Sequence, residues 1–181
     1  MNAKLISLAA AFMLTLSACG GSSGGGSPPP PPPPPPITVA EAYQFLNQST
    51  FGATEAEAQT VINQRFDAWI DAEMNKPASL QQPHLRSLPR PMNLAELHAD
   101  RVDVWFRNVV DGPDQLRQRV AFALSEIMVV SQLGALTQAP YSVADYYDVL
   151  ANNAFGNYRE LIEEVTLHPA MGVYLSMLGN E

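Results

Sequence analysis

The sequence predicts an all-α domain: an irregular bundle of about seven helices around one central buried helix, preceded by a disordered Gly/Ser and polyproline tether. Apolar residues recur at the three- and four-residue spacing of a helix face, and helix-capping residues punctuate the chain from Thr38 onward. The alternation of apolar and polar residues typical of a strand is absent. The chain has 181 residues, which fits one such domain over 37–181 plus N-terminal appendages.

Residues 1–18 are predicted to be a lipoprotein signal peptide. Lys4 supplies a positive charge, an apolar stretch follows, and Leu16-Ser17-Ala18-Cys19 resembles a bacterial lipobox. In such signals the cysteine becomes the lipidated first residue of the mature protein, so Cys19 is the predicted lipidation site. The alternative is an ordinary secretory signal with a chance cysteine. Because Cys19 is the single cysteine of the sequence, its lipidation would leave no thiol for a disulfide or a metal.

Residues 19–36 are predicted to be the lipidated cysteine and a linker. Residues 20–27 are all Gly and Ser, a flexible composition, and residues 28–36 are consecutive prolines. A polyproline helix of that length is stiff and extends about 28 Å at ~3.1 Å per residue. We interpret it as a spacer that holds the domain away from a membrane. The alternative is a docking ligand for a proline-binding module.

Local signals predict four helices and a loop in the first part of the domain. Capping boxes of the form Thr-x-x-Glu at 38–41 and 54–57 open two helices. A third helix runs from Phe66 towards Met74, and Asn93 caps a fourth that closes at Asp111-Gly112. Residues 77–91 contain four prolines and are predicted to be an irregular loop. The stripes predicted to face inward are Ala42, Phe45 and Leu46; Ala58, Val61 and Ile62; Phe66, Trp69, Ile70 and Met74; and Leu94, Leu97, Val102, Trp105, Phe106 and Val109.

The stretch 113–131 is predicted to be the central buried helix. Pro113 is suited to the first helical position, and between Ala121 and Val130 only Ser125 and Glu126 are polar. A helix that is apolar on nearly every side is usually buried.

Three further helices are predicted after this stretch. Ser142-x-x-Asp145 resembles a capping box, Asn157 caps the next helix, and a last short helix runs from His168-Pro169 through Leu178. Their apolar stripes are Val143, Tyr146, Tyr147, Leu150 and Ala154, and then Tyr158, Leu161, Ile162 and Val165.

Composition and motifs exclude several classes of function. The formal net charge is −8, and no basic patch is visible, which argues against nucleic-acid binding. His-Glu-x-x-His, Cys-x-x-Cys, calcium-loop, Gly-x-Ser-x-Gly and phosphate-loop patterns are all absent. We therefore expect no metal and no cofactor.

Three residues are candidates for chemistry. Glu126 interrupts an apolar run, and a buried carboxylate must be paired or protonated, so it is a candidate acid, base or ligand. The alternative is a structural ion pair or a polar strip that reaches solvent. His168 could act as a ligand or base with Glu164, one turn earlier; the alternative is a histidine that caps the carbonyls of the preceding helix.

Several segments together resemble the domain of unknown function 1800 family, a bacterial family of mostly exported proteins. They are Phe45-Leu-Asn-Gln-Ser-Thr-Phe-Gly-Ala-Thr54, Trp69-Ile-Asp71, Arg117-Gln-Arg-Val-Ala-Phe-Ala-Leu-Ser-Glu-Ile127, Tyr146-Tyr-Asp-Val-Leu150, Asn153-Ala-Phe-Gly-Asn-Tyr-Arg159 and His168-Pro-Ala-Met171. The resemblance covers about 40–181 and implies no settled activity. Members are considerably longer, so the chain is expected to be the N-terminal portion of a longer protein.

Two hypotheses for function follow, and whether the protein is an enzyme stays open. The first is an exported, envelope-anchored lipoprotein that acts as an interaction or assembly module. Its partners would be the membrane, through lipidated Cys19, and an envelope protein. Gly20 after the cysteine, rather than Asp, favours the outer membrane. The alternative is an envelope hydrolase whose site pairs Glu126 or His168 with residues beyond Glu181.

Overall fold

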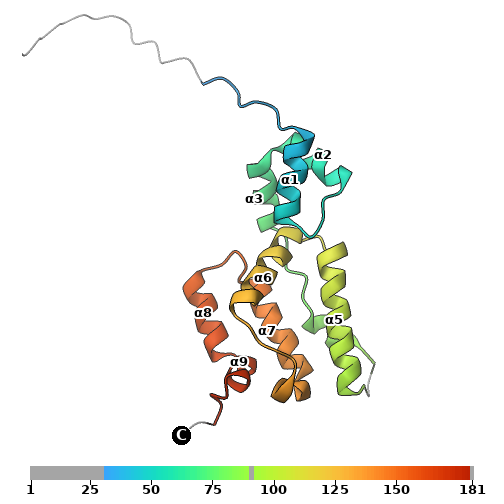
Figure 1. The fold of residues 1–181 in the computed structure, drawn as a ribbon, viewed down its shortest axis with the longest axis vertical. Helices are drawn as coiled ribbons and strands as arrows, with labels where there is room; N and C mark the ends of the chain where they lie inside the picture. Colours follow the sequence, from blue (N-terminus) through green and yellow to red (C-terminus); the bar gives the residue numbers. More distant parts are fainter. Residues whose placement is uncertain (1–30, 90–91, 180–181) are drawn as a thin grey trace, which may run out of the picture. The chain divides into compact units, whose positions relative to one another are not determined.

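The computed structural model describes residues 31–89 and 92–179 (Figure 1). The predicted signal peptide, Cys19 and most of the linker lie outside these residues. The chain from Pro35 onward forms one compact unit, and residues 31–34 belong to a separate one.

The described part of the chain is all-α, as predicted, and contains no strand. Its elements in chain order are α1 (Val39–Ser49), α2 (Glu55–Gln64), α3 (Phe66–Met74), α4 (Gln82–Ser87), α5 (Leu94–Asp111), α6 (Gln115–Ile127), the 3-10 helix η1 (Gly134–Gln138), α7 (Pro140–Asn152), α8 (Tyr158–Leu167) and α9 (Pro169–Tyr174).

Local capping decides where most of these helices begin. The Thr38 side chain accepts the Glu41 N–H, and the Glu41 carboxylate accepts the Thr38 N–H at 2.8 Å. The same reciprocal pair opens α2 at Thr54 and α5 at Asn93, as the sequence predicts for α2. The predicted box at Ser142 is wrong, because α7 begins at Pro140, whose fixed φ suits the first helical turn.

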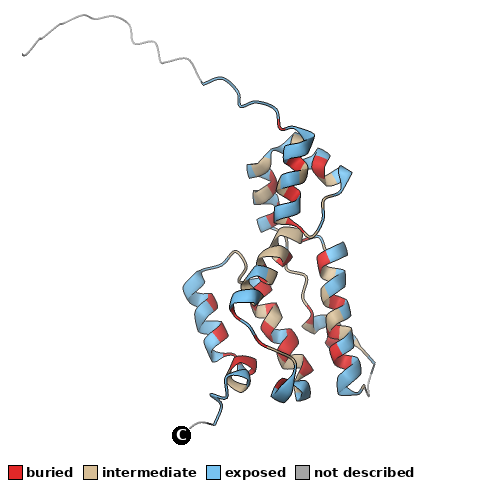
Figure 2. Cartoon of the chain, in the orientation of Figure 1, coloured by how far each residue is buried: buried red, intermediate tan, exposed pale blue. Residues whose placement is uncertain are grey.

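Within the described residues, two hydrophobic clusters form much of the interior. One lies among α1, α2 and α3 around Leu46 and Val61, which are fully buried. The other joins α6, α7, α8, α9 and η1 around Tyr146 and Leu150 (Figure 2). Helix α6 connects them, since Leu116 packs against the first cluster and Leu124 against the second.

The central buried helix is α7. It contacts α4, α5, α6, α8, α9 and η1. Seven of its thirteen residues are buried: Pro140, Val143, Ala144, Tyr146, Asp148, Leu150 and Ala151. The buried Tyr146 hydroxyl donates to the Met128 carbonyl at 2.7 Å, which ties α7 to the segment that follows α6.

The stretch 113–131 is therefore not the central helix, and the sequence prediction is wrong on this point. Helix α6 ends at Ile127, and only Gln118 and Ala121 within it are buried. The chain leaves the helix so that Met128 and Val130 enter the core, while Val129 between them is exposed. That alternation is the side-chain period of extended backbone, and a helix could not bury both residues in this way.

Residues 77–89, the described part of the predicted irregular loop, are also more regular than predicted. They contain the short helix α4, and Pro83 lies in its first turn, where no hydrogen bond is lost. The loop is held by polar contacts to two aspartates: Asp114 accepts the Ser79 N–H and hydroxyl, and Asp148 accepts the N–H groups of Gln81 and Gln82.

Other predicted inward positions face solvent. Exposed side chains in the predicted stripes are Met74, Leu94, Phe106, Tyr158 and Ile162. The last helix is shorter than predicted, because α9 ends at Tyr174 rather than continuing to Leu178.

Candidate functional site

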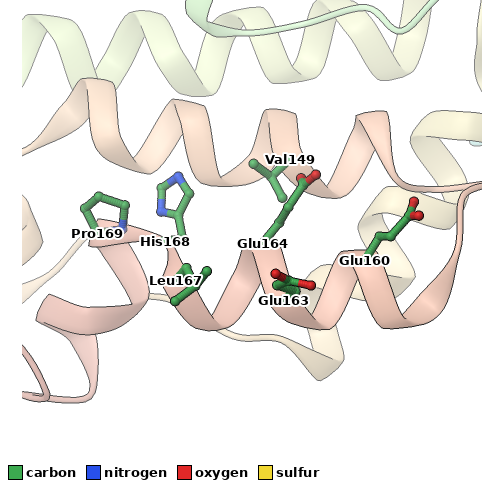
Figure 3. Close-up of a pocket in the computed structure, with 7 residues that line it drawn as sticks. All are labelled: Val149, Glu160, Glu163, Glu164, Leu167, His168 and Pro169. Atoms are coloured by element: carbon green, nitrogen blue, oxygen red, sulfur yellow. The ribbon is translucent and has the colours of Figure 1, made fainter.

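An open cavity of about 440 Å³ lies where α8 meets α7 and α9. Its lining comprises Val149, Glu160, Glu163, Glu164, Leu167, His168 and Pro169 (Figure 3). The sequence candidates His168 and Glu164 both line this cavity, so the fold brings them to one place. All three glutamates come from α8, which gives the cavity a negative wall that favours cations.

His168 is buried and fully engaged. Its Nδ1 accepts the Ala170 N–H at 3.1 Å, and its Nε2 lies 3.3 Å from the Asp145 carboxylate. The ring stands edge-on to Tyr146, with the centroids 5.2 Å apart. His168 thus caps the beginning of α9 with its side chain, and its backbone N–H donates to the Val165 carbonyl, so it also caps the end of the preceding helix, α8.

Glu164 does not pair with His168. Its carboxylate accepts the Asn153 side-chain amide at 2.8 Å, and it points towards α7 beside Val149 (Figure 3). Since Asn153 also donates to the Val149 carbonyl at 3.0 Å, Glu164 helps to fasten α8 to the end of α7. The described contacts of both candidates are consistent with structural roles.

Glu126 lies in a different place. It is exposed and lines a second pocket of about 240 Å³ between α5, α6 and α7. The premise of a buried carboxylate is therefore wrong: the helix face carrying Glu126 is not covered within the described residues. Arg119, seven residues earlier in α6, lies over the Phe51 ring at 5.2 Å.

Sequence reasoning missed the carboxylates that are buried. Asp114 is fully buried and accepts hydrogen bonds from the Ser79 N–H, the Ser79 hydroxyl and the Gln118 amide. Asp148 accepts the N–H groups of Gln81 and Gln82 at 2.7 and 2.8 Å. No local pattern marked Asp148 for burial, because at helical spacing it lies off the apolar stripe formed by Val143, Tyr146, Tyr147 and Leu150.

Burial raises the pKa of Asp148 to about 6, against the lowering effect of the two N–H donors, and the neighbouring Asp145 charge raises it further. The ordinary value is 3.8, so the folded chain holds this proton more tightly than the unfolded chain. The contribution of Asp148 to stability is therefore fully present below about pH 4 and is lost as the pH rises through about 6.

We expect a pH-dependent stability difference between the wild type and Asp148→Asn, which does not titrate. On passing from pH 7 to pH 5, the wild type should gain about 1 kcal/mol of unfolding free energy relative to the variant. Urea denaturation of both proteins at the two pH values measures this. Parallel pH dependence of the two proteins would contradict the raised pKa.

In residues 31–89 and 92–179, no three His, Cys, Asp or Glu side chains are grouped so that they could hold a metal ion.

Searches of curated proteins and of solved structures found no match to the chain. A family model described as "Protein of unknown function (DUF1800)" matches residues 44–181, well over half of the chain and in agreement with the resemblance carried by the sequence motifs. The chain therefore belongs to the DUF1800 family of proteins of unknown function.

Proposed function

We propose that this protein is a bacterial envelope lipoprotein whose DUF1800 domain serves as an interaction or assembly module. The observation that carries the proposal is Leu16-Ser17-Ala18-Cys19 at the end of a charged, apolar leader. A lipid on Cys19 would anchor the chain, and the Gly/Ser and polyproline segment would hold the domain away from the bilayer. Gly20 after the cysteine favours the outer membrane. Among the helices that the structure describes, none has the length and apolarity needed to cross a bilayer.

Exposed apolar side chains support the interaction role. From the last residue of α9 onward, Tyr174, Leu175, Met177 and Leu178 are 39%, 56%, 46% and 72% exposed. Four large apolar residues within five positions are more than scattered surface hydrophobics, and such patches commonly mark protein contacts. An envelope protein is the partner we propose for this segment.

One observation favours the second candidate function, an envelope hydrolase. His168 and Glu164 line the same cavity, although each is engaged elsewhere. A catalytic role for either residue would require further groups, which this hypothesis assigns to residues beyond Glu181. A histidine that acts as a general base needs a free ring nitrogen within reach of its substrate. The Nε2 of His168 already contacts the Asp145 carboxylate, so the interaction role is the better supported proposal.

The anchor is tested by fatty-acid labelling and fractionation of the full chain in cells. The wild type is expected to take up labelled fatty acid and to sediment with membranes. Cys19→Ser, which removes the acceptor thiol, is expected to take up no label and to leave the membrane fraction. An unlabelled wild type whose Cys19→Ser variant still sediments with membranes would overturn the lipoprotein proposal.

The interaction role is tested by methionine oxidation of the wild-type chain in the same cells. Met177 and Met74 are 46% and 42% exposed, so they form a matched pair within one molecule. If a partner covers the segment after α9, Met177 should oxidise severalfold more slowly in cells than in the purified chain, while Met74 keeps its rate. Equal rates for Met177 in both settings would count against a partner at this segment.

A further inference from the structure

Arg101 is a buried cation with incomplete pairing. It lies in α5 and is 8% exposed. One guanidinium nitrogen, Nη2, donates to the Gln132 side chain, and the guanidinium lies 5.4 Å from the centre of the Tyr147 ring. The Nε is buried without a hydrogen-bond partner. Among residues 31–89 and 92–179, no carboxylate lies within ion-pair distance of Arg101.

Burial of the Arg101 guanidinium without a counter-charge destabilises the folded state. Burial lowers the pKa of Arg101, which reports that its surroundings disfavour the charged form. An amide oxygen and an aromatic face offset only part of the lost hydration, and buried arginines are ordinarily paired with a carboxylate or phosphate. The guanidinium therefore lacks an anionic acceptor that its burial calls for.

The missing acceptor has a place to bind. Arg101 lines the 240 Å³ pocket that also contains Glu126, so this side chain borders an open space as well as the core. The remaining lining is mostly apolar and aromatic, with Val102, Trp105 and Phe106 from α5, Phe122 from α6 and Tyr147 from α7. Trp105 meets Phe106 edge to face at 4.9 Å and lies 6.1 Å from Phe122, which forms an aromatic wall.

We infer that this pocket binds a small organic carboxylate with an apolar, preferably aromatic, body. Its carboxylate accepts hydrogen bonds from Arg101, and its body packs against Trp105 and Phe122. The volume is below the ~300–1,000 Å³ of sites for drug-sized ligands, so the ligand is small. Such a ligand matches the lining at both ends. Its carboxylate can accept two hydrogen bonds from the guanidinium, and its aromatic ring can be buried against the aromatic walls.

Glu126 sets the polarity of the mouth. It is exposed at the same pocket, so its charge repels a second negative group on the ligand. The pocket therefore selects a single carboxylate directed inwards, and it disfavours dicarboxylates. In this view Glu126 is a specificity residue, in place of the acid or base that the sequence suggested.

The test uses phenylacetate as the probe and the full chain in detergent. Trp105 lines the pocket, whereas the second tryptophan, Trp69, is buried in the other cluster and serves as an internal reference. Phenylacetate should change tryptophan fluorescence saturably below about 10 mM, and phenethylamine, which carries the opposite charge on a similar body, should not. No saturable change, or equal responses to the two probes, would overturn the inference.

Variants assign the contact to the pocket. Arg101→Gln should weaken phenylacetate binding by about tenfold or more, while the matched control Arg119→Gln, outside the pocket lining, should leave it unchanged. Because Arg101→Gln alters a buried residue, Phe106→Ser provides a second variant: Phe106 is 54% exposed, so its loss should spare the fold and still weaken binding. Unchanged affinity in a folded Arg101→Gln, or in Phe106→Ser, would overturn the inference.

Discussion

Replacing Leu150 with alanine is expected to lower the free energy of unfolding by about 2–5 kcal/mol. Leu150 is fully buried in α7, the helix against which α4, α5, α6, α8, α9 and η1 pack. Truncation removes the favourable free energy of burying the side chain away from water. It also leaves a cavity, because the six surrounding elements cannot move together to fill the space. Against a typical total stability of about 5–15 kcal/mol, this is a large loss, measurable by urea or guanidinium denaturation.

Leu124→Ala is the matched control, because it makes the same chemical change in α6. Leu124 is only partly buried at the edge of the same cluster, so solvent already reaches its surroundings. Its truncation should cost clearly less than that of Leu150. If Leu124→Ala proved as destabilising as Leu150→Ala, or more so, the assignment of α7 as the central helix would be wrong.

Asp114→Ala is expected to destabilise the protein by about 2–4 kcal/mol. The Asp114 carboxylate is fully buried and accepts the Ser79 N–H at 2.9 Å, the Ser79 hydroxyl at 2.6 Å and the Gln118 amide at 2.9 Å. Alanine leaves the half-buried Ser79 N–H without an acceptor and releases the loop from the start of α6. Chemical denaturation of the variant beside the wild type measures the loss.

Asp111→Ala supplies the comparison for this change. Asp111 is an exposed aspartate three positions earlier, at the end of α5, so its replacement should alter stability by only about 0.5 kcal/mol or less. The comparison separates the effect of losing the buried hydrogen bonds of Asp114 from the effect of removing one negative charge. Equal effects of the two substitutions would contradict the structural role of Asp114.

The candidate site illustrates where sequence reasoning reached its limit. The local pattern singled out His168 and Glu164, and the fold does gather them at one cavity. It also singled out Glu126 for its apolar neighbours in sequence, yet that carboxylate is exposed. Arg101 is buried and incompletely paired, yet it sits among ordinary polar residues of a helix and carries no local signal.

The sequence by itself determined the helical class, the start of most helices and the membership of the DUF1800 family. Thr38 and Thr54 begin α1 and α2 through hydrogen bonds that span three residues, so the information is local. The same holds for Asn157, whose side chain accepts the Arg159 N–H at the start of α8.

Only the tertiary structure decided which helix is buried and which charged side chains are removed from solvent. Between Ala121 and Val130 only Ser125 and Glu126 are polar, but burial depends on how many neighbours a helix acquires, and α7 is enclosed by elements from both sides of it in the chain. Likewise, Asp114 is buried because Ser79, 35 residues away, donates to it. Such contacts arise from the packing of distant segments, and no local pattern of residues encodes them.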